Sequence, residues 1–139
     1  RNELAMNNIE RLLLLVSETT GAGTHPMDPR IKAVLERIAT SPADDHSVPR
    51  LARSISLSPS RFAHLFKTET GRTPQRFVSE VRLREAATLV AMTTMPIADV
   101  ATAVGYASAF HSSSAFRARH GVSPRTYRAG RARPITADA

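Results

Sequence analysis

The chain has 139 residues, of which 42% are hydrophobic, 19 are basic and 12 are acidic, so its formal net charge is +7. This length suits one domain of ordinary size with a short extension. The absence of Cys excludes disulfide scaffolds and thiolate metal sites. No apolar run approaches the ~18 residues that a membrane-spanning helix needs, and the run Leu12–Val16 is too short for a signal peptide. We therefore expect a soluble cytoplasmic protein without a cofactor or metal, and the initial Arg1 suggests a fragment of a longer chain.

Residues 3–17 contain no Gly or Pro and place apolar residues at helical spacing, which predicts a helix. One of its stripes has the spacing of a coiled-coil seam and consists of Leu4, Asn7, Arg11 and Leu14. This seam predicts dimerisation through the helix, and the alternative is that the helix packs on the rest of the same chain. Residues 18–27, which contain Gly21, Gly23 and Pro26, predict a flexible linker.

Start signals, in which Ser, Thr or Asp caps a helix or Pro occupies its first position, divide the rest of the chain into helices. The signals stand at Asp28, Ser47, Ser58, Thr73, Pro96, Ser108 and Ser123. They predict helices at about residues 29–38, 48–53, 59–70, 75–92, 97–104, 109–120 and 124–127. No segment alternates with period two, so the expected fold class is all-α.

Two stretches of the chain repeat at an offset of 50 residues. Ser58, Phe66, Lys67, Gly71, Thr73, Pro74 and Phe77 recur as Ser108, Phe116, Arg117, Gly121, Ser123, Pro124 and Tyr127. A short apolar helix and a tight turn precede each copy, and the second turn contains Gly105, which suits a positive φ. A short helix, a tight turn and a capped helix form the helix-turn-helix pattern, whose second helix enters the major groove of DNA. The repeat therefore predicts two helix-turn-helix subdomains within residues 28–130, with a helical repeat that serves packing alone as the alternative.

The helix predicted at residues 75–92 joins the two units. About 18 residues at 1.5 Å each would span ~27 Å. With the turns at its ends, this helix would bring the two recognition helices close to the ~34 Å that separates successive turns of the major groove. The charge pattern agrees with a phosphate-binding surface, because no acidic residue lies between Asp99 and Asp138 while six Arg residues do. We therefore expect one chain to contact two successive major grooves of double-stranded DNA.

Several segments resemble the motifs of the AraC/XylS family of transcriptional regulators, and the resemblance covers residues 28–130. They are Leu57–Lys67, Gly71–Pro74, Met95–Ala101, Gly105–Tyr106 and Gly121–Arg128. Residues Glu10–Leu14 and His25–Asp28 are similar to the dimerisation helix and the linker of the arabinose-responsive members. The resemblance implies that residues 1–17 end a dimerisation or sensor domain missing from this chain, and that residues 131–139 form a disordered tail. It also implies a bacterial, nucleoid-associated activator that forms a homodimer, contacts RNA polymerase and responds to a sugar such as arabinose.

The candidate DNA-binding residues lie at the starts and on the outer faces of the two recognition helices. In the first unit they are Ser58, Ser60, Arg61, Ala63, His64 and Lys67. In the second unit they are Ser108, Phe110, His111, Ser113, Ser114 and Arg117, with Arg119 as a further phosphate ligand. The resemblance implies that Ser60 and His64 read bases, while Arg61 and Lys67 suit phosphates, or Arg61 a guanine. We expect Phe62, Leu65 and Phe66 to point into the core.

The second unit departs from the family pattern at Ser112, where the first copy has Phe62 and family members usually carry a large apolar residue. Either Phe110 turns inward to fill the vacancy, or this unit packs poorly and holds DNA loosely. An unfilled void of that size would cost about 3 kcal/mol. We therefore expect the first unit to supply most of the sequence specificity and the second to add contacts to the DNA backbone.

Two classes of function other than a specific regulator are to be weighed for this sequence. A nonspecific or architectural nucleic-acid-binding protein would need only the basic charge, and it remains the main alternative. An enzyme is not expected, because the chain contains no HExxH, no GxSxG and no glycine-rich phosphate loop.

Overall fold

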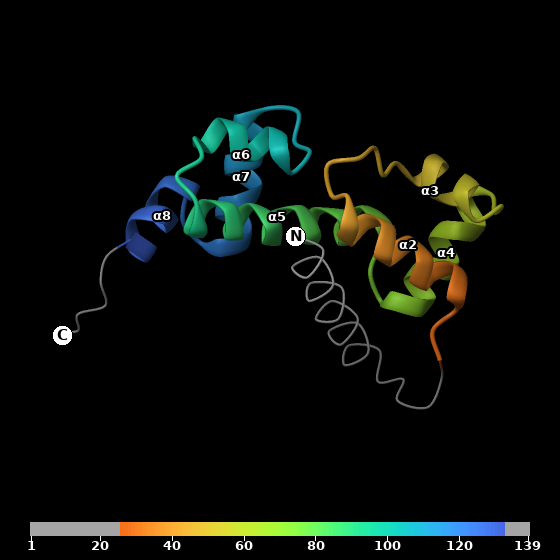
Figure 1. Cartoon of the computed structure of the whole chain (residues 1–139). Coiled ribbons are helices and arrows are strands. Elements are labelled where there is room, and N and C mark those ends of the chain that lie inside the picture. Colours follow the sequence, from red (N-terminus) through yellow and green to blue (C-terminus); the bar gives the residue numbers. More distant parts are fainter. Residues whose placement is uncertain (1–25, 133–139) are drawn as a thin grey trace. The chain divides into compact units, whose positions relative to one another are not determined.

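The computed structural model describes residues 26–132 of the chain. Its helices are α2 (Pro29–Thr40), α3 (Val48–Ser54), α4 (Pro59–Thr70), α5 (Pro74–Met92), α6 (Ile97–Ala103), α7 (Ala109–His120) and α8 (Pro124–Ala132). These residues contain no strand, so the prediction of an all-α fold is confirmed. The chain divides into two compact units, one ending at Val81 and the other starting at Arg82. Helix α5 begins in the first unit and ends in the second (Figure 1).

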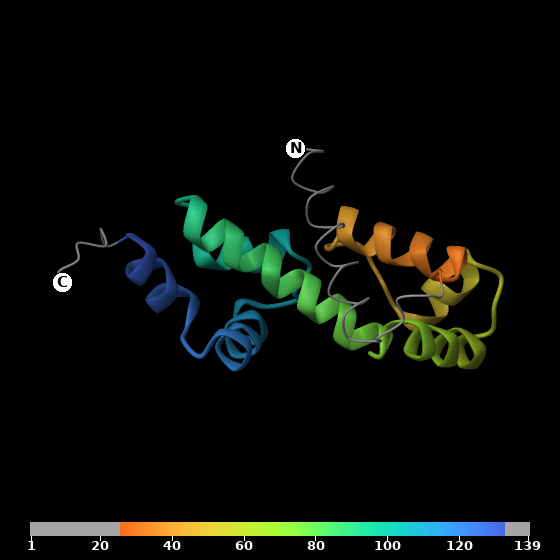
Figure 2. The same cartoon turned by 90° about the horizontal axis from the view of Figure 1, so that it is seen from below.

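The first unit is built around one apolar face of α2. Its buried residues Ile31, Val34, Leu35 and Ile38 recur at the spacing of one helix face, and they pack in one cluster with Leu51 of α3 and the rings of α4 and α5. The ring of Phe66 lies 5.6 Å from that of Phe62 and 5.9 Å from that of Phe77. Figure 2 shows α2 alongside α4, and α3 also packs on α4. The recognition helix α4 is therefore held from behind by two helices.

The second unit has its own core on the later part of α5. The buried residues Leu83, Ala86, Ala87 and Val90 of α5 cluster with Val100 of α6, Val104 of the following turn and Phe116 of α7. Tyr127 of α8 packs partly against this cluster. In Figure 1 α6 and α7 lie together beside this part of α5. The helix-turn-helix arrangement is thus repeated, with α6 and α7 in the roles of α3 and α4.

Capping side chains close most helix starts that the sequence predicted. The Asp28 carboxylate accepts a hydrogen bond from the Arg30 backbone N–H at 2.8 Å. Hydrogen bonds from Arg30 hold the pKa of the Asp28 carboxyl below its ordinary range. At α4 and α7 the hydroxyls of Ser58 and Ser108 accept the N–H groups of Arg61 and His111 at 3.2 and 3.1 Å. These bonds satisfy N–H groups that have no partner within their own helix.

The capping prediction is wrong at Ser47, which precedes α3 but makes no capping bond through its side chain. Its backbone N–H instead donates to the Asp45 carboxylate at 3.1 Å. Pro49 already lies in the first turn of α3 and has no N–H to satisfy, so fewer donors remain for a cap.

Both helix-turn-helix turns close with the same backbone hydrogen bond. The Leu57 N–H donates to the Ala52 carbonyl, and the Tyr106 N–H donates to the Ala101 carbonyl, each at 3.0 Å. The bend needs a left-handed residue, which is Ser56 at φ 59° in the first turn and Gly105 at φ 103° in the second. The prediction of a positive φ at Gly105 is confirmed, whereas Ser56 carried no such signal.

Several predicted segments extend beyond the described part of the chain. The dimerisation seam of Leu4, Asn7, Arg11 and Leu14 lies outside the described residues, as do the linker residues up to 25. Met27, the last residue of the predicted linker, packs partly against the first core. Helix α8 continues to Ala132, past the predicted boundary at residue 130, and residues 133–139 again lie outside the described part.

Candidate nucleic-acid interface

Helix α4 separates an inner face from an outer polar face. Phe62 and Phe66 are fully buried, as predicted, and Leu65 is only half-buried at the edge of the core. The outer residues stand at positions i, i+3, i+4 and i+7, which share one face of a helix. The exposed candidates of this unit are Ser58, Ser60, Arg61, His64 and Lys67, and Ala63 is half-buried. The structure therefore brings the predicted residues of the first unit together on one accessible surface.

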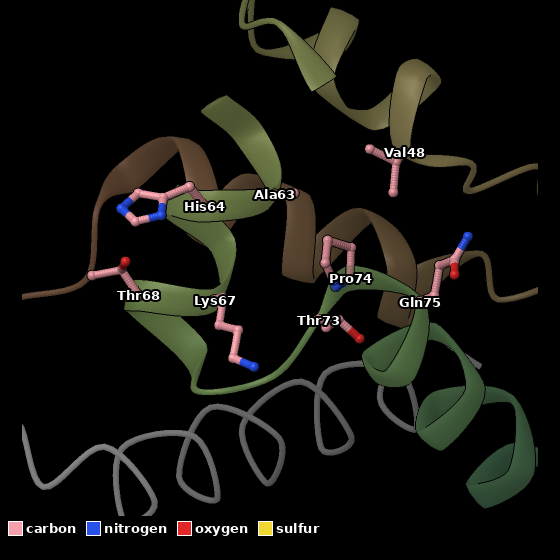
Figure 3. A pocket seen from close by; sticks show the side chains of 8 residues that line it. All are labelled: Val48, Ala63, His64, Lys67, Thr68, Thr73, Pro74 and Gln75. Carbon is pink, nitrogen blue, oxygen red and sulfur yellow. The ribbon is translucent and has the colours of Figure 1, made fainter. Parts of the chain in front are cut away.

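A groove runs along this outer face, and we call it the α4 groove (Figure 3). It is lined by Val48 at the start of α3, by Ala63, His64, Lys67 and Thr68 of α4, and by Thr73, Pro74 and Gln75 at the start of α5. The Thr73 hydroxyl accepts the Arg76 N–H at 3.2 Å, which caps α5 beside the groove. Because a helix start carries a partial positive charge, the groove combines that charge with the Lys67 ammonium group. A phosphate group would suit the positive charge of this groove.

His64 also borders a second hollow on the same helix. That hollow is lined by Arg30, Leu57, Ser60, Arg61, His64 and Leu65. The imidazole of His64 thus stands on a ridge between two depressions, where a base edge approaching α4 would reach its ring nitrogens.

The cations of the first unit differ in whether an acid already neutralises them. Glu80 forms ion pairs with both Arg72, at 3.1 Å, and Arg76, at 3.5 Å. Within residues 26–132, Arg61 and Lys67 form no ion pair. Their full charge is available to an anion, so these two are the phosphate ligands that the geometry favours.

Helix α7 presents the corresponding face of the second unit. Phe110, His111, Ser114, Arg117 and Arg119 are exposed, and Ser108 and Ser113 are half-buried. The Ser108 hydroxyl, which caps α7, also lies 3.0 Å from Nδ1 of His111. This hydrogen bond restrains the imidazole at the helix start. All the predicted residues of this unit thus lie on α7 or at its cap, and of those within the helix only Ser113 is half-buried.

The hypothesis that Phe110 turns inward is wrong. Its side chain is 75% exposed, while Ser112 occupies the core position and is only 4% exposed. Phe110 is the second residue of α7 and points away from the core, so a rotation about its side-chain bonds does not carry the ring to the site of Ser112.

The second core obtains its third ring from His120. In the first unit the ring cluster is Phe62, Phe66 and Phe77. In the second unit the ring of Phe116 lies 5.3 Å from Tyr127 and 4.4 Å from His120. The third ring therefore comes from the end of the helix rather than from its first turn. Sequence reasoning missed His120, because Thr70 stands at its place in the first copy and the repeat gives no reason to expect a ring there.

Sequence reasoning also missed the part that Thr73 and Gln75 play. The Thr73-Pro74 pair predicts only a helix start, whereas Thr73, Pro74 and Gln75 form one wall of the α4 groove. The signal was present in the chain, since a helix start that follows a recognition helix after a short turn must lie near the end of that helix.

Residues 26–132 contain neither a cluster of metal ligands nor a membrane-spanning helix. No group of three or more His, Asp or Glu side chains there could hold a metal ion. None of the helices described there is long and apolar enough to cross a membrane.

Comparison with known proteins identifies the family. The family described as "Helix-turn-helix domain" matches residues 51–130. The chain is 35% identical to the arabinose operon regulatory protein of Salmonella typhimurium over 129 residues, which make up 91% of this chain and 46% of that protein. The chain therefore spans less than half the length of this relative.

Solved structures give the same result. A transcriptional regulator with an AraC-type DNA-binding domain from Chromobacterium violaceum superposes with a TM-score of 0.69 and 28% identity, covering 76% of this chain and 95% of that one. The DNA-binding domain of AdpA, solved in complex with a target DNA, superposes with a TM-score of 0.72 and 26% identity, covering 78% of this chain and 98% of that one.

These relatives and this fold are those of DNA-binding regulators rather than of enzymes. The match extends over both helix-turn-helix units and both polar faces described above. The chain belongs to the AraC/XylS family of transcriptional regulators and contains the DNA-binding domain of that family.

Proposed function

We propose that this chain recognises a specific sequence in double-stranded DNA by placing α4 and α7 in two successive major grooves, and that it regulates transcription from that site. The observation that carries the proposal is the outer face of α4. There Ser60 and His64 are exposed beside cations that form no ion pair in the described part of the chain. Side chains with hydrogen-bonding groups read base edges, and cations fix the register on the phosphates.

The residues of α4 divide into two roles. Ser60 and His64 read bases because they lie on the middle of the outer face. Arg61 and Lys67 bind phosphates because they lie nearer its borders, and Lys67 shares the α4 groove with the start of α5. On α7 the same division gives base contacts to Phe110, Ser113 and Ser114, and phosphate contacts to Arg117 and Arg119.

A selection of binding sites from a random DNA pool, followed by two variants, tests this division. His64→Ala should weaken binding to the selected site about tenfold and leave binding to random DNA nearly unchanged, because one base contact is worth ~1–3 kcal/mol. Lys67→Ala should weaken binding to both DNAs and lower the slope of log K against log salt by ~0.9. Equal losses for His64→Ala on the two DNAs would refute base reading by His64.

A nonspecific or architectural role is the second candidate, since Arg61, Lys67 and Arg117 alone would support it. Competition between the selected site and random DNA at physiological salt separates the two roles. A specific regulator should prefer its site by at least ~10³, and a ratio near one would favour the architectural role.

The wider activity of the protein follows from the family and is part of the proposal. We infer a homodimer formed through Leu4, Asn7, Arg11 and Leu14, a sugar such as arabinose as the effector, and activation through contact with RNA polymerase. The likeness to the arabinose operon regulatory protein supports the choice of sugar.

Two measurements test these wider roles. Sedimentation of the chain and of a Leu14→Glu variant should show a dimer only for the unaltered chain. A reporter gene is placed behind the selected site in cells that express this protein from its natural gene. Its expression should respond to arabinose. A monomer at all concentrations, or a reporter indifferent to arabinose, would contradict the corresponding inference.

A further inference from the structure

Phe110 is the most conspicuous apolar side chain on the recognition surface of the second unit. The other four Phe residues of the chain, Phe62, Phe66, Phe77 and Phe116, are all fully buried. Phe110 is 75% exposed, and its ring makes an edge contact with His111 at 5.9 Å. An apolar ring left in water is unfavourable for the free protein, so a partner that covered the ring would gain binding energy from the contact.

The surroundings of Phe110 indicate what that partner is. Phe110, Ser114 and Arg117 are exposed at positions i, i+4 and i+7, and they form one stripe along α7. The stripe joins an apolar ring at the capped start of the helix to a hydroxyl and then to a cation. The last turn of α7 adds Arg119, and α7 contains no acidic residue. Such a positive stripe complements a polyanion rather than the apolar surface of another protein.

Among the groups that line the major groove, only one is complementary to a phenyl ring. Guanine, cytosine and adenine present hydrogen-bond donors and acceptors there, which a phenyl ring would cover without replacing their bonds to water. Thymine presents its 5-methyl group beside a single acceptor. We infer that the second unit reads a thymine in the DNA site through contact between the Phe110 ring and the thymine 5-methyl group.

This inference rests on the proposed function, and it changes the expected balance between the two units. A loose second unit would give contacts to the DNA backbone only. An exposed Phe110 gives that unit a reader of its own, which distinguishes bases by a methyl group and not by hydrogen bonds. At the corresponding position of the first unit stands Ser60, so the two recognition helices read by different chemistry.

The test removes the methyl group from the DNA and the ring from the protein. Each thymine of the selected site is replaced in turn by deoxyuridine, which lacks only the 5-methyl group, and the Kd is measured for the full chain. For the unaltered protein we expect one position, in the part of the site covered by α7, where the replacement weakens binding about fourfold, the change expected for burying one methyl group. The Phe110→Ala variant should bind the DNA with thymine at that position and the DNA with uracil there equally well. Its affinity for both should be lower than that of the unaltered protein for the thymine site, because the ring is lost.

Two control variants make the result specific. Ser60→Ala changes the corresponding residue of the first unit, and it should weaken binding while keeping the fourfold difference between thymine and uracil. Phe110→Leu keeps an apolar side chain and should keep a difference of more than twofold. Thermal unfolding should be the same for Phe110→Ala as for the unaltered chain, because the ring contributes nothing to the core.

The outcomes separate this inference from the proposed function. If the chain does not distinguish its selected site from random DNA, the proposed function fails, and the methyl contact fails with it. If specific binding holds but no thymine shows a uracil effect that depends on Phe110, only the methyl contact is refuted. If Phe110→Ala leaves DNA binding unchanged and instead alters the sedimentation of the chain, the ring is covered by a protein surface, and the inference is also refuted.

Discussion

Ser56 and Gly105 occupy the left-handed position in the two helix-turn-helix turns, and only Ser56 has a Cβ there. Ser56 has φ 59° and Gly105 has φ 103°. A residue with a Cβ pays about 1 kcal/mol in the left-handed region, and the more extreme φ of Gly105 lies outside the region that such residues tolerate best. The first turn therefore keeps a small strain that the second avoids.

This contrast predicts opposite effects for exchanging the two residues. Gly105→Ser should lower the free energy of unfolding by about 1–2 kcal/mol, whereas Ser56→Gly should change it by less than about 0.5 kcal/mol, because relief of strain offsets the greater freedom of the unfolded chain. Urea titration followed by circular dichroism measures both. Gly130→Ser is the matched control, since a Cβ at this helical glycine meets nothing within 4 Å and should not destabilise the protein. A loss at Gly105 no greater than at Gly130 would contradict the argument.

His120 shows how one residue can compensate for another at a distance along a helix. Ser112 removes a ring from the first turn of α7, and His120 adds one at the last residue, 4.4 Å from Phe116 and 5.6 Å from Tyr127. Within residues 26–132 its Nε2 is buried without a hydrogen-bond partner, so His120 serves here as an aromatic ring rather than as a polar group. The ring that Ser112 lacks in the first turn of α7 is thus replaced by a ring from the last residue of that helix.

At the scale of elements, Arg128 joins α8 to the rest of the second unit by hydrogen bonds, in addition to the packing of Tyr127. Arg128 donates from Nε to the Val90 carbonyl at 2.9 Å and from Nη2 to the Met95 carbonyl at 2.7 Å. These carbonyls lie near the end of α5 and just before α6, where no helical partner remains for them. The planar guanidinium reaches both at once, which a single ammonium group does not.

We therefore predict that Arg128→Lys lowers the free energy of unfolding of the second unit by about 1.5–3 kcal/mol, the range for hydrogen bonds to a charged group. Hydrogen exchange of the α7 and α8 amides would report the change locally. Arg125→Lys, an exposed neighbour on α8, should have almost no effect. Similar losses for both variants would mean that Arg128 contributes only its charge.

At the scale of the whole molecule, the arrangement of charge matters more than its total of +7. Some arginines already form ion pairs with acidic residues, as Arg72 and Arg76 do with Glu80. Others stand on the outer faces of α4 and α7, where phosphates would release their condensed counterions on binding. Net charge alone therefore overstates the number of cations available to DNA.

The salt dependence of DNA binding tests this distinction. Arg117→Ala should reduce the slope of log K against log salt by ~0.9, the effect of one lost phosphate contact. Arg37→Ala removes the same charge from the exposed side of α2 and should leave the slope within about 0.3 of the original value. Equal reductions for the two variants would show that only the total charge of the protein counts.

Much of this protein was predictable from its sequence because the relevant signals are local. The Ser-Pro, Thr-Pro and Asp-Pro pairs mark helix starts through backbone geometry and capping, which involve residues within one turn. The repeat at an offset of 50 residues then predicted two similar units and the polar faces of α4 and α7. Leu65, expected inside, is half-buried, because the edge of a core depends on neighbours from other helices.

What the sequence alone determined is the pair of helix-turn-helix units with their basic, polar recognition helices, because helix periodicity and caps arise within each segment. Only the tertiary structure decided which cations remain unpaired, which residues from α3 and α5 complete the α4 groove, and how the second core is filled. Those outcomes depend on contacts between segments that lie far apart in the sequence. The position of Phe110 is the clearest case, since only the packing of Phe116, His120 and Tyr127 shows that the core does not require its ring.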